Sequence, residues 1–351
     1  MFIINYNMKK YYFLINSLEW GGAERVTLNL AKKYQKEGIK IYIITLKKDV
    51  FYDFPNWIQH IPLSNVKNNF LMSLLIPRYV IKFKKIIKKH NLSEWISLLE
   101  IANFVHILSK KNAIISFRAH ISFFTWLIGY IYKLLIKRLY PKAWKIIVNS
   151  YENKYDLAEY LKIPEEKVEV LYNPIDTKKI NQLKNEEVEK NILEKIENKK
   201  IFITTWRLVW QKHHEKILEA LQIYNQKSNK NRIYLIVWDW PERKKLEKLT
   251  EKYGLSNKVV FLWQQTNVFK YLNVADVFLY ASEVEGFPNV LLEAREIGVP
   301  IITSDFKSGA KEVIIWSYDK NTCKNIAYPY QGKYWIIVDY QNYKEQLLKF
   351  L

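Results

Sequence analysis

The chain has 351 residues, 49% of them apolar and 26% charged, and this composition excludes both a disordered chain and a membrane-embedded bundle. Its one cysteine, Cys323, excludes an internal disulfide framework, so a reducing cytoplasm is the expected compartment. Lys and Arg outnumber Asp and Glu by 55 to 35, and most of the excess lies in residues 1–172, whose net charge is +14.

The first half alternates strand and helix patterns. An apolar run at 11–16 is followed by a glycine pair, a helical pattern that stops at Gly38, and a second apolar run at 39–45. This order predicts a β-α-β unit. Further strands are predicted at 95–99, 113–117 and 145–149. Strands separated by helical segments in this way predict a doubly wound parallel sheet.

The second half repeats this organisation after a turn at 173–176. Strands are predicted at 201–205, 232–237, 259–262, 277–280 and 301–303, and helices at 214–224, 242–253, 268–274 and 289–297. We therefore expect two α/β domains, residues 1–172 and 173–351, with a cleft between them.

Neither a leader nor a membrane span is predicted. Residues 1–15 lack the apolar core of a signal peptide. The longest apolar stretch, 123–136, is interrupted by Lys133 and is shorter than the roughly 20 residues that cross a bilayer. The same stretch remains compatible with a position on a membrane surface.

Two glutamates lie around a predicted helix start in the second half. Glu285 follows the strand at 277–280, and Gly286 permits close approach of the backbone. Pro288 suits a first helical turn, and Glu293 lies one turn inside the helix. Free N–H groups at such a helix start bind anions. A capped helix with a solvated glutamate is the alternative interpretation.

Two basic residues follow the strand at 201–205. Arg207 and Lys212 lie at the sheet edge where open α/β sheets bind ligands. A forked guanidinium and an ammonium can stabilise a diphosphate leaving group in a site that excludes water. Alone they would be surface charges, but they share a domain and a sheet edge with Glu285, so we expect one site.

Four motifs together resemble one enzyme family. They are Gly21-Gly-Ala-Glu-Arg25, Asn173-Pro-Ile-Asp176, Arg207-Leu-Val-Trp-Gln-Lys212 and Glu285-Gly-Phe-Pro-Asn-Val-Leu-Leu-Glu293. The set resembles the retaining glycosyltransferases of family 4, also called group 1, over residues 11 to 338. The resemblance implies a GT-B fold, in which two Rossmann-like domains face each other across a cleft. The first domain would bind the acceptor and the second the nucleotide-sugar donor.

The resemblance also assigns roles to single residues of the donor domain. Glu285 would contact hydroxyls of the donor sugar, and Glu293 the nucleotide ribose. Arg207 and Lys212 would hold the donor diphosphate. The other donor-binding residues expected in this loop and helix start are Gly286, Phe287, Pro288, Asn289, Val290 and Leu291.

In the first domain the resemblance singles out two segments. Gly21 and Gly22 would approach the diphosphate and the acceptor. Arg118 and His120 follow the strand at 113–117 and would face the acceptor or the donor sugar. For His120 a purely structural role is the alternative.

The implied reaction needs neither metal nor cofactor. The chain contains no Asp-x-Asp, no His-Glu-x-x-His and no cysteine pair, so cationic side chains and helix termini would stabilise the leaving diphosphate. An acceptor hydroxyl would attack the anomeric carbon with retention of configuration, and the leaving phosphate would assist as the base. A UDP-linked N-acetylhexosamine is the expected donor. A sugar-nucleotide epimerase of the same fold is an alternative, but it lacks this transferase loop.

Two basic segments of the first domain suggest a membrane-held acceptor. Residues 78–90 place Ile81, Ile86 and Ile87 near one face with Lys on the others, and residues 123–138 mix aromatic with basic residues. Such segments suit an anionic membrane surface, although packed helices with solvated lysines are the alternative. The acceptor would be a polyprenyl-diphosphate-linked glycan or a glycolipid in surface polysaccharide synthesis, on the inner face of the cell membrane. The chain shows no nucleic-acid-binding module, so no specific nucleic-acid partner is expected.

Tryptophan stands in motifs where this family has glycine. The chain has 12 Trp and 9 Gly, and the Trp in such motifs are Trp206, Trp210, Trp238, Trp240, Trp263 and Trp335. These loop positions are expected to need positive φ or close approach to a phosphate, which disfavours an indole. Either the chain is an inactive relic with a blocked donor site, or its gene uses UGA as a glycine codon. We favour the second, because random decay would not replace one residue type by one other so often.

Overall fold

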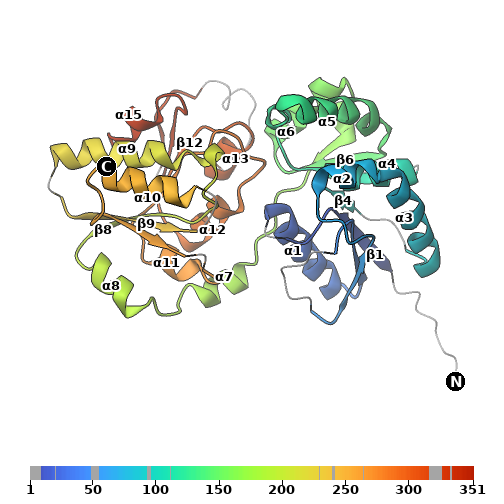
Figure 1. Cartoon of the computed structure of the whole chain (residues 1–351), viewed down its shortest axis with the longest axis horizontal. Helices are drawn as coiled ribbons and strands as arrows, with labels where there is room; N and C mark the ends of the chain where they lie inside the picture. Colours follow the sequence, from blue (N-terminus) through green and yellow to red (C-terminus); the bar gives the residue numbers. More distant parts are fainter. Residues whose placement is uncertain are drawn as a thin grey trace. The chain divides into compact units, whose positions relative to one another are not determined.

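The computed structural model divides the chain into two compact units, Met1–Pro174 and Ile175–Leu351 (Figure 1). The residues that the structure describes are 9–19, 21–48, 55–92, 96–110, 112–228, 230–238, 242–263, 265–315, 326–332 and 334–351. Within them, none of the helices has both the length and the hydropathy of a membrane-spanning segment.

The N-terminal unit is built on a seven-stranded sheet in the order β3-β2-β1-β4-β5-β6-β7, with every neighbouring pair parallel. Its strands are β1 (Lys10–Ile15), β2 (Lys40–Thr45), β3 (Ile58–Pro62), β4 (Ile96–Leu98), β5 (Ile114–Phe117), β6 (Lys145–Val148) and β7 (Val168–Val170). Its helices are α1 (Gly22–Lys36), α2 (Asn69–Leu74), α3 (Ile76–His90), α4 (Glu100–Ser109), α5 (Trp126–Leu139) and α6 (Tyr151–Leu161), with short 3-10 helices η1 (Ile121–Phe123), η2 (Tyr140–Lys142) and η3 (Glu165–Lys167).

The C-terminal unit has a second seven-stranded sheet, in the order β10-β9-β8-β11-β12-β14-β13. Its strands are β8 (Lys200–Thr204), β9 (Arg232–Val237), β10 (Val259–Leu262), β11 (Val277–Tyr280), β12 (Ile301–Ser304), β13 (Tyr330–Gln331) and β14 (Trp335–Val338). Its helices are α7 (Thr177–Leu183), α8 (Lys190–Ile196), η4 (Trp210–Lys212), α9 (His214–Lys227), α10 (Arg243–Lys252), α11 (Phe269–Asn273), α12 (Asn289–Ile297), α13 (Ala310–Ile315) and α15 (Tyr343–Leu347).

The central strands are apolar on both faces, as parallel strands between two helical layers must be. All six residues of β9 are buried, and so are the last four of β1. Helix ends follow local signals as well. Helix α12 stops at Gly298, whose φ of 94° suits glycine and whose N–H reaches the carbonyls of Ala294 and Arg295.

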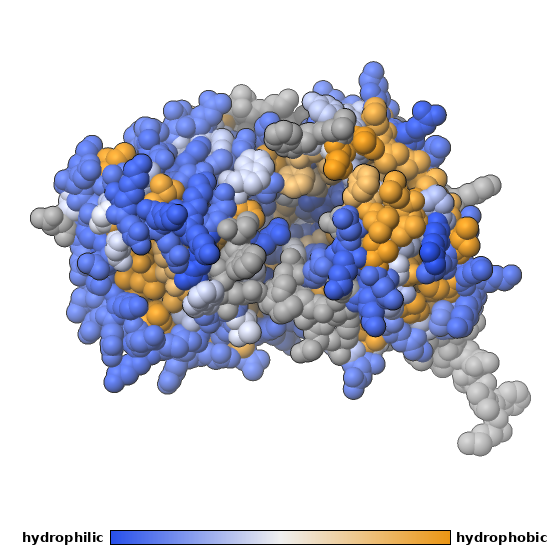
Figure 2. Space-filling model, viewed as in Figure 1, coloured by the Kyte–Doolittle hydropathy of each residue, from blue (hydrophilic) through white to orange (hydrophobic). Residues whose placement is uncertain are grey.

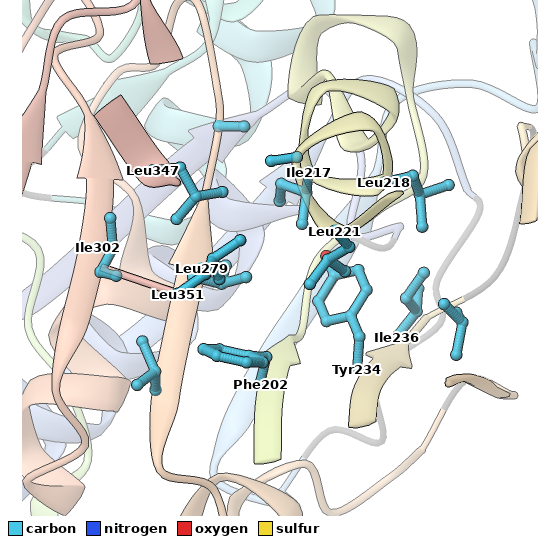
Figure 3. Close-up of a cluster of buried hydrophobic side chains, with 14 of the residues drawn as sticks. Phe202, Ile217, Leu218, Leu221, Tyr234, Ile236, Leu279, Ile302, Leu347 and Leu351 are labelled. Carbon is cyan, nitrogen blue, oxygen red and sulfur yellow. The ribbon is translucent and has the colours of Figure 1, made fainter. Parts of the chain in front are cut away.

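One buried apolar cluster fixes the C-terminal sheet to its covering helices (Figure 3). Phe202, Tyr234 and Leu279 come from the neighbouring strands β8, β9 and β11. Ile217 of α9 and Leu347 of α15 meet them from above the sheet. Side chains buried this fully contribute roughly 1.5–3 kcal/mol each, so the strand ends that carry the loops described below are held rigidly.

The strand order reverses once in each sheet, between β1 and β4 and between β8 and β11. Ligands of open α/β sheets bind outside the carboxyl ends of the strands at such a point. In the C-terminal unit Phe278 of β11 pairs with Ile203 of β8, so the loops that follow these two strands begin side by side.

Several elements were not predicted. Strand β3 reads Ile-Gln-His-Ile-Pro, and its weak alternation gives little signal. Strands β13 and β14 were missed at the other end, and β13 runs antiparallel to β14, so the expectation of a wholly parallel second sheet is wrong at this edge. Trp335 was expected in a loop, but it is the first residue of β14 and lies over the Arg295 guanidinium.

Helix α3 corrects the expected pattern of residues 78–90. Ile86 and Ile87 pack against a buried apolar cluster of the N-terminal unit, whereas Ile81 is 59% exposed. Ile81 therefore lies among the exposed basic residues of the helix and not with the other two isoleucines.

Candidate functional site

The loops after β8 and β11 meet at the point where the C-terminal sheet reverses its strand order. The first loop carries Arg207 and leads into η4, which contains Lys212. The second carries Glu285 and leads into α12. The parallel pairing of the two strands brings these three predicted residues to one end of one sheet.

Glu285 is held at this end by three donors to one carboxylate oxygen. Lys212 Nζ forms an ion pair with Glu285 Oε1. The Tyr280 hydroxyl donates to the same oxygen at 2.5 Å, and Ser282 Oγ donates at 2.7 Å. Among the residues described, no hydrogen bond reaches Oε2 of Glu285, so this oxygen remains available to an external hydroxyl.

The Lys212–Glu285 pair is largely shielded from water. The side chains are 12% and 15% exposed. Burial lowers the pKa of the Lys212 ammonium, the Glu285 carboxylate opposes that shift, and the Arg207 charge lowers it further. Arg207 and Lys212 both follow β8 at this end of the sheet. A second anion beside Lys212 would therefore be attracted by two cations.

Arg207 itself is exposed. Within the described ranges its guanidinium makes neither a hydrogen bond nor an ion pair. A guanidinium without a protein partner, beside a shielded ammonium, presents the fork geometry that suits a phosphate.

The predicted helix start at 289 is confirmed, with one difference. Pro288 precedes the helix as its N-cap residue and does not lie in the first turn. Three other predicted positions in the loop and helix are buried, whereas Gly286, Asn289 and Val290 are half-buried. Phe287 is 5% exposed, Leu291 is fully buried, and Glu293 is 1% exposed inside α12.

A loop after β12 supports the Glu285 loop. Ser308 Oγ donates to the Gly286 carbonyl at 2.6 Å, and Val284 forms a bridge with Lys307. Ser308 has a φ of 78°, a left-handed backbone that costs energy outside glycine. The contact of Ser308 with Gly286 compensates part of that cost and fixes the loop backbone just after Glu285.

Trp206 is packed against Tyr280, whose hydroxyl donates to Glu285, and against His214. Its ring centroid lies 4.1 Å from that of Tyr280 and 5.3 Å from that of His214. The indole is 5% exposed, and its Nε1 is shielded from solvent with no hydrogen-bond acceptor among the described residues. An unsatisfied buried donor of this kind costs about 1–3 kcal/mol. Burial lowers the pKa of the neighbouring His214 to about 3, so that ring is neutral.

The expected backbone strain at the tryptophans is not found. Trp206, Trp210, Trp238, Trp263 and Trp335 all lie outside the left-handed region, in contrast to the described residues that do have positive φ. Trp210 and Trp263 are 57% and 65% exposed. Of the two expectations for these positions, positive φ is therefore wrong at five of them, and close approach to a phosphate stays a prediction. Trp240 lies outside the described residues.

In the N-terminal unit, Gly21 and Gly22 begin helix α1. Gly21 is the N-cap residue, with an extended φ of −160°, and Gly22 is the first helical residue. A Cβ on Gly21 would lie 2.8 Å from Cδ of Glu24, which is 8% exposed. Glycine at 21 thus makes room for the Glu24 carboxylate at the third position of the helix, where an acidic residue is favourable.

Arg118 and His120 follow β5 and have different surroundings. The Arg118 guanidinium donates to Asn173 Oδ1, while its Nε and Nη2 are shielded and have no acceptor among the described residues. Burial lowers the pKa of Arg118 to about 10. His120 Nδ1 accepts from the Ser122 N–H at 3.2 Å as the N-cap of η1, and its Nε2 lies 3.5 Å from Asp156. His120 therefore has a structural function in the turn.

Two family models match the chain in succession. The model described as Glycosyltransferase Family 4 matches residues 20–179, and the model described as Glycosyl transferases group 1 matches residues 185–325. The chain belongs to the group 1 glycosyl transferases. It is therefore a transferase of the hexosyltransferase type, as the sequence predicted.

Curated relatives agree with this assignment. An uncharacterized glycosyltransferase of Methanocaldococcus jannaschii is 32% identical over 204 residues, which are 58% of this glycosyltransferase and 50% of that protein. The N-acetylgalactosamine-N,N'-diacetylbacillosaminyl-diphospho-undecaprenol 4-alpha-N-acetylgalactosaminyltransferase of Campylobacter jejuni is 28% identical over 320 residues, 87% of this chain and 83% of that protein.

Solved structures show the fold of this glycosyltransferase. A glycosyltransferase from Rickettsia africae matches with a TM-score of 0.74 at 22% identity, over 98% of this chain and 87% of that one. HepE from Anabaena, in complex with UDP and glucose, matches with a TM-score of 0.69 at 15% identity, over 97% and 88% of the two chains. The predicted GT-B class, with two Rossmann-like units, is confirmed.

The sequence did not single out the hydroxyls that support Glu285 in this glycosyltransferase. Ser282 lies three residues before Glu285, so its proximity to Glu285 follows from the sequence. Tyr280 ends a buried strand, and a strand residue gives no sign that its hydroxyl will turn toward a carboxylate. Among the described residues, no cluster of three His, Cys, Asp or Glu side chains could hold a metal ion.

His213 makes the stability of the donor unit depend on pH. Its Nδ1 bonds Glu215 at 3.0 Å and its Nε2 lies 3.3 Å from Glu283, and the Glu215 bond is the main reason why the pKa of His213 is raised. A raised histidine pKa stabilises the fold fully below the unfolded value of about 6.5, and the gain is lost as pH rises through the folded pKa.

We expect the substitution His213→Asn to remove this dependence. Asparagine tolerates the left-handed φ of 46° at this position. Urea unfolding from roughly pH 5 to pH 9 should show the variant less stable by about 1–2 kcal/mol at the acid end. The gap should narrow as pH rises, down to the loss of the 2.7 Å hydrogen bond between His213 Nε2 and the Tyr340 hydroxyl, which a neutral ring keeps. A gap that stayed constant with pH would contradict this origin.

Proposed function

We propose that this glycosyltransferase moves a sugar from a nucleotide-diphospho-sugar to a hydroxyl of a glycan or lipid-linked acceptor, with retention of configuration. The observation that carries the proposal is the shielded Lys212–Glu285 pair at the reversal point of the second sheet, at the same sheet end as Arg207, whose guanidinium has no partner among the described residues. A carboxylate oxygen open to a sugar hydroxyl and two cations suited to a diphosphate lie at one sheet edge.

The proposed chemistry forms one bond and breaks one. The acceptor oxygen bonds to the anomeric carbon while the bond between that carbon and the diphosphate oxygen breaks. The acceptor proton passes to the leaving phosphate. Arg207 and Lys212 stabilise the charge that develops on the diphosphate, so the reaction proceeds without a metal. Glu285 orients the donor sugar through its hydroxyls.

The remaining predicted residues take supporting roles in this proposal. Glu293 binds the ribose, and residues 286–291 surround the donor with the free N–H groups of the α12 start. Gly21 and Gly22 approach the diphosphate from the N-terminal unit. Arg118, with two guanidinium nitrogens unsatisfied, is the stronger acceptor-side candidate, and His120 acts by holding η1.

For the donor we propose a UDP-linked N-acetylhexosamine, and for the acceptor a polyprenyl-diphosphate-linked glycan in surface polysaccharide synthesis. Support comes from the UDP and glucose bound to HepE and from the undecaprenol-linked acceptor in the name of the Campylobacter relative. The enzyme would then work on the cytoplasmic face of the membrane, where nucleotide sugars are made.

The tryptophans bear on whether the donor site is open. We propose that the six residues written as Trp in glycine motifs are glycine in the cell, through UGA codons. The unsatisfied Nε1 of Trp206, beside the residues that hold Glu285, supports this proposal. The alternative, an inactive relic, is favoured by the dense packing of the same ring. UGG codons at 206, 238, 240 and 263 would exclude recoding.

A donor screen tests the proposed function. The chain as printed and a second protein with glycine at the six positions are melted with UDP-, GDP- and dTDP-sugars, and nucleotide release is then followed with an undecaprenyl-diphosphate acceptor. We expect UDP-sugars to raise the Tm of the glycine protein, and release to require acceptor and to be unaffected by EDTA. If no nucleotide sugar raised the Tm of either protein, the proposal would be wrong.

A further inference from the structure

Helix α5 exposes an apolar face. Ile128, Ile131 and Leu134 follow each other at helical spacing and are 56%, 50% and 68% exposed. Its opposite face is fixed to the unit by the fully buried Ile136 and by Gly129, where a Cβ would lie 2.7 Å from the backbone of Phe124. The helix therefore cannot rotate to bury its apolar side.

Helix α2 extends the same surface. Phe70, Leu71 and Leu74 are 63%, 45% and 63% exposed. The two helices touch, since Ser73 of α2 and Tyr132 of α5 share a hydrogen bond of 3.0 Å. Figure 2 shows hydrophobic side chains gathered over this part of the N-terminal unit. We name the α2–α5 face by its six exposed residues, Phe70, Leu71, Leu74, Ile128, Ile131 and Leu134. A contiguous apolar surface of this kind marks a binding partner.

The helices α2, α3 and α5 carry charged side chains of one sign. Residues 54–93 and 101–151, which contain α2, α3 and α5, include no Asp or Glu. Exposed Lys137 and Arg138 end α5, Arg78 lies in the first turn of α3, and Lys133 Nζ lies 5.5 Å from the Tyr130 ring centre. Helix α6, whose Tyr160 hydroxyl donates to the Lys133 carbonyl of α5, adds acidic residues on one side only. An apolar face with cations at the ends of its helices complements the acyl chains and phosphates of an anionic bilayer.

We propose that the α2–α5 face inserts into the interface of an anionic membrane. The inserting residues are apolar, and the basic ends of α5 and α3 contact lipid phosphates. A protein partner would need to match this surface with a large excess of acidic residues, whereas an anionic bilayer supplies the charge everywhere. This docking would present the N-terminal unit to the lipid-linked acceptor. That consequence rests on the proposed function, whereas the binding of the α2–α5 face to lipid is independent of it.

Vesicle flotation without donor or acceptor tests the proposal. The probes are vesicles of phosphatidylcholine alone and of phosphatidylcholine with roughly a third phosphatidylglycerol. We expect the full chain to float with the anionic vesicles and much less with the neutral ones. The triple variant I128S/I131S/L134S should bind at least about tenfold more weakly, because its apolar contribution is gone. The variant K137E/R138E should lose at least about tenfold at low salt.

A matched control separates this surface from general hydrophobicity. Leu108 on α4 and Leu193 on α8 are 46% and 44% exposed and lie outside the α2–α5 face. The variant L108S/L193S should float like the original chain, and circular dichroism should show all variants folded. The proposal is overturned if the original chain does not float, if the triple variant floats equally well, or if the control loses as much. Because no sugar donor is present, none of these results depends on transferase activity.

Discussion

Replacing Glu285 with glutamine should lower kcat/KM for sugar transfer about 100- to 1,000-fold. Glutamine keeps the size of the side chain but leaves a weaker acceptor for the donor hydroxyl. It also leaves the Lys212 ammonium, 12% exposed, without its counter-charge beside the Arg207 guanidinium. Initial rates with the preferred nucleotide sugar measure the effect. The substitution is made in the more active of two proteins, the chain with tryptophan or the chain with glycine at the six positions.

The matched control for E285Q is E283Q. Glu283 lies in the same loop, is 44% exposed and contacts His213, not Lys212. We expect E283Q to keep kcat/KM within about threefold, because exposed ion pairs contribute little. Loss of the buried pair should also destabilise E285Q by about 3 kcal/mol, so urea unfolding must show that the variant is folded under assay conditions. A folded E285Q with a tenth or more of the original kcat/KM would remove Glu285 from the proposed role.

Replacing Trp206 with glycine should create or strengthen nucleotide binding. The indole fills the space next to Tyr280, whose hydroxyl holds Glu285, and its Nε1 has no acceptor among the described residues. Removing a large buried side chain usually lowers the free energy of unfolding by about 3–5 kcal/mol. Here the loss is smaller by about 1–3 kcal/mol, because the substitution also removes a buried donor that has no acceptor. We expect the Kd for UDP to fall at least about tenfold in W206G, equivalent to about 1.4 kcal/mol. Calorimetric titration of W206G and of the starting chain with UDP measures the two Kd values.

Two other tryptophans serve as controls for W206G. Trp210 and Trp263 are 57% and 65% exposed, so W210G and W263G remove indoles that fill no buried space. Their Kd values for UDP should stay within about twofold of the starting protein. Equal affinity of W206G and the starting chain would mean that the indole does not obstruct the nucleotide.

The central strands were predictable because they carry their signal locally. Strands β9 and β11 are short apolar runs that are buried on both faces of a parallel sheet. The edge strand β10 is equally apolar, and all three were predicted with their observed bounds. Helix α12 was equally predictable, because a proline precedes it and a glycine follows it. Strand β3 at the sheet edge is half polar, and the antiparallel β13 is only two residues long. Strands β3 and β13 depend on pairing partners that their local sequence does not identify.

The candidate site was predictable in its residues but not in its contacts. Arg207, Lys212 and Glu285 could be placed at one sheet edge because each follows a strand of the same domain. That Tyr280 and Ser282 converge on a single oxygen of Glu285 depends on rotamers set by the packed side chains around them. At the tryptophan positions the predicted backbone conformation was wrong, because a glycine in a family motif does not always adopt a left-handed backbone.

Each unit encloses its own apolar clusters, and the boundary falls at Pro174. Two cores of this size need not melt together, and where they melt apart each unit has its own free energy of unfolding. A nucleotide that binds only the C-terminal unit would protect only that part of the unfolding curve. The unfolding transition whose midpoint a ligand raises therefore identifies the unit that binds the ligand.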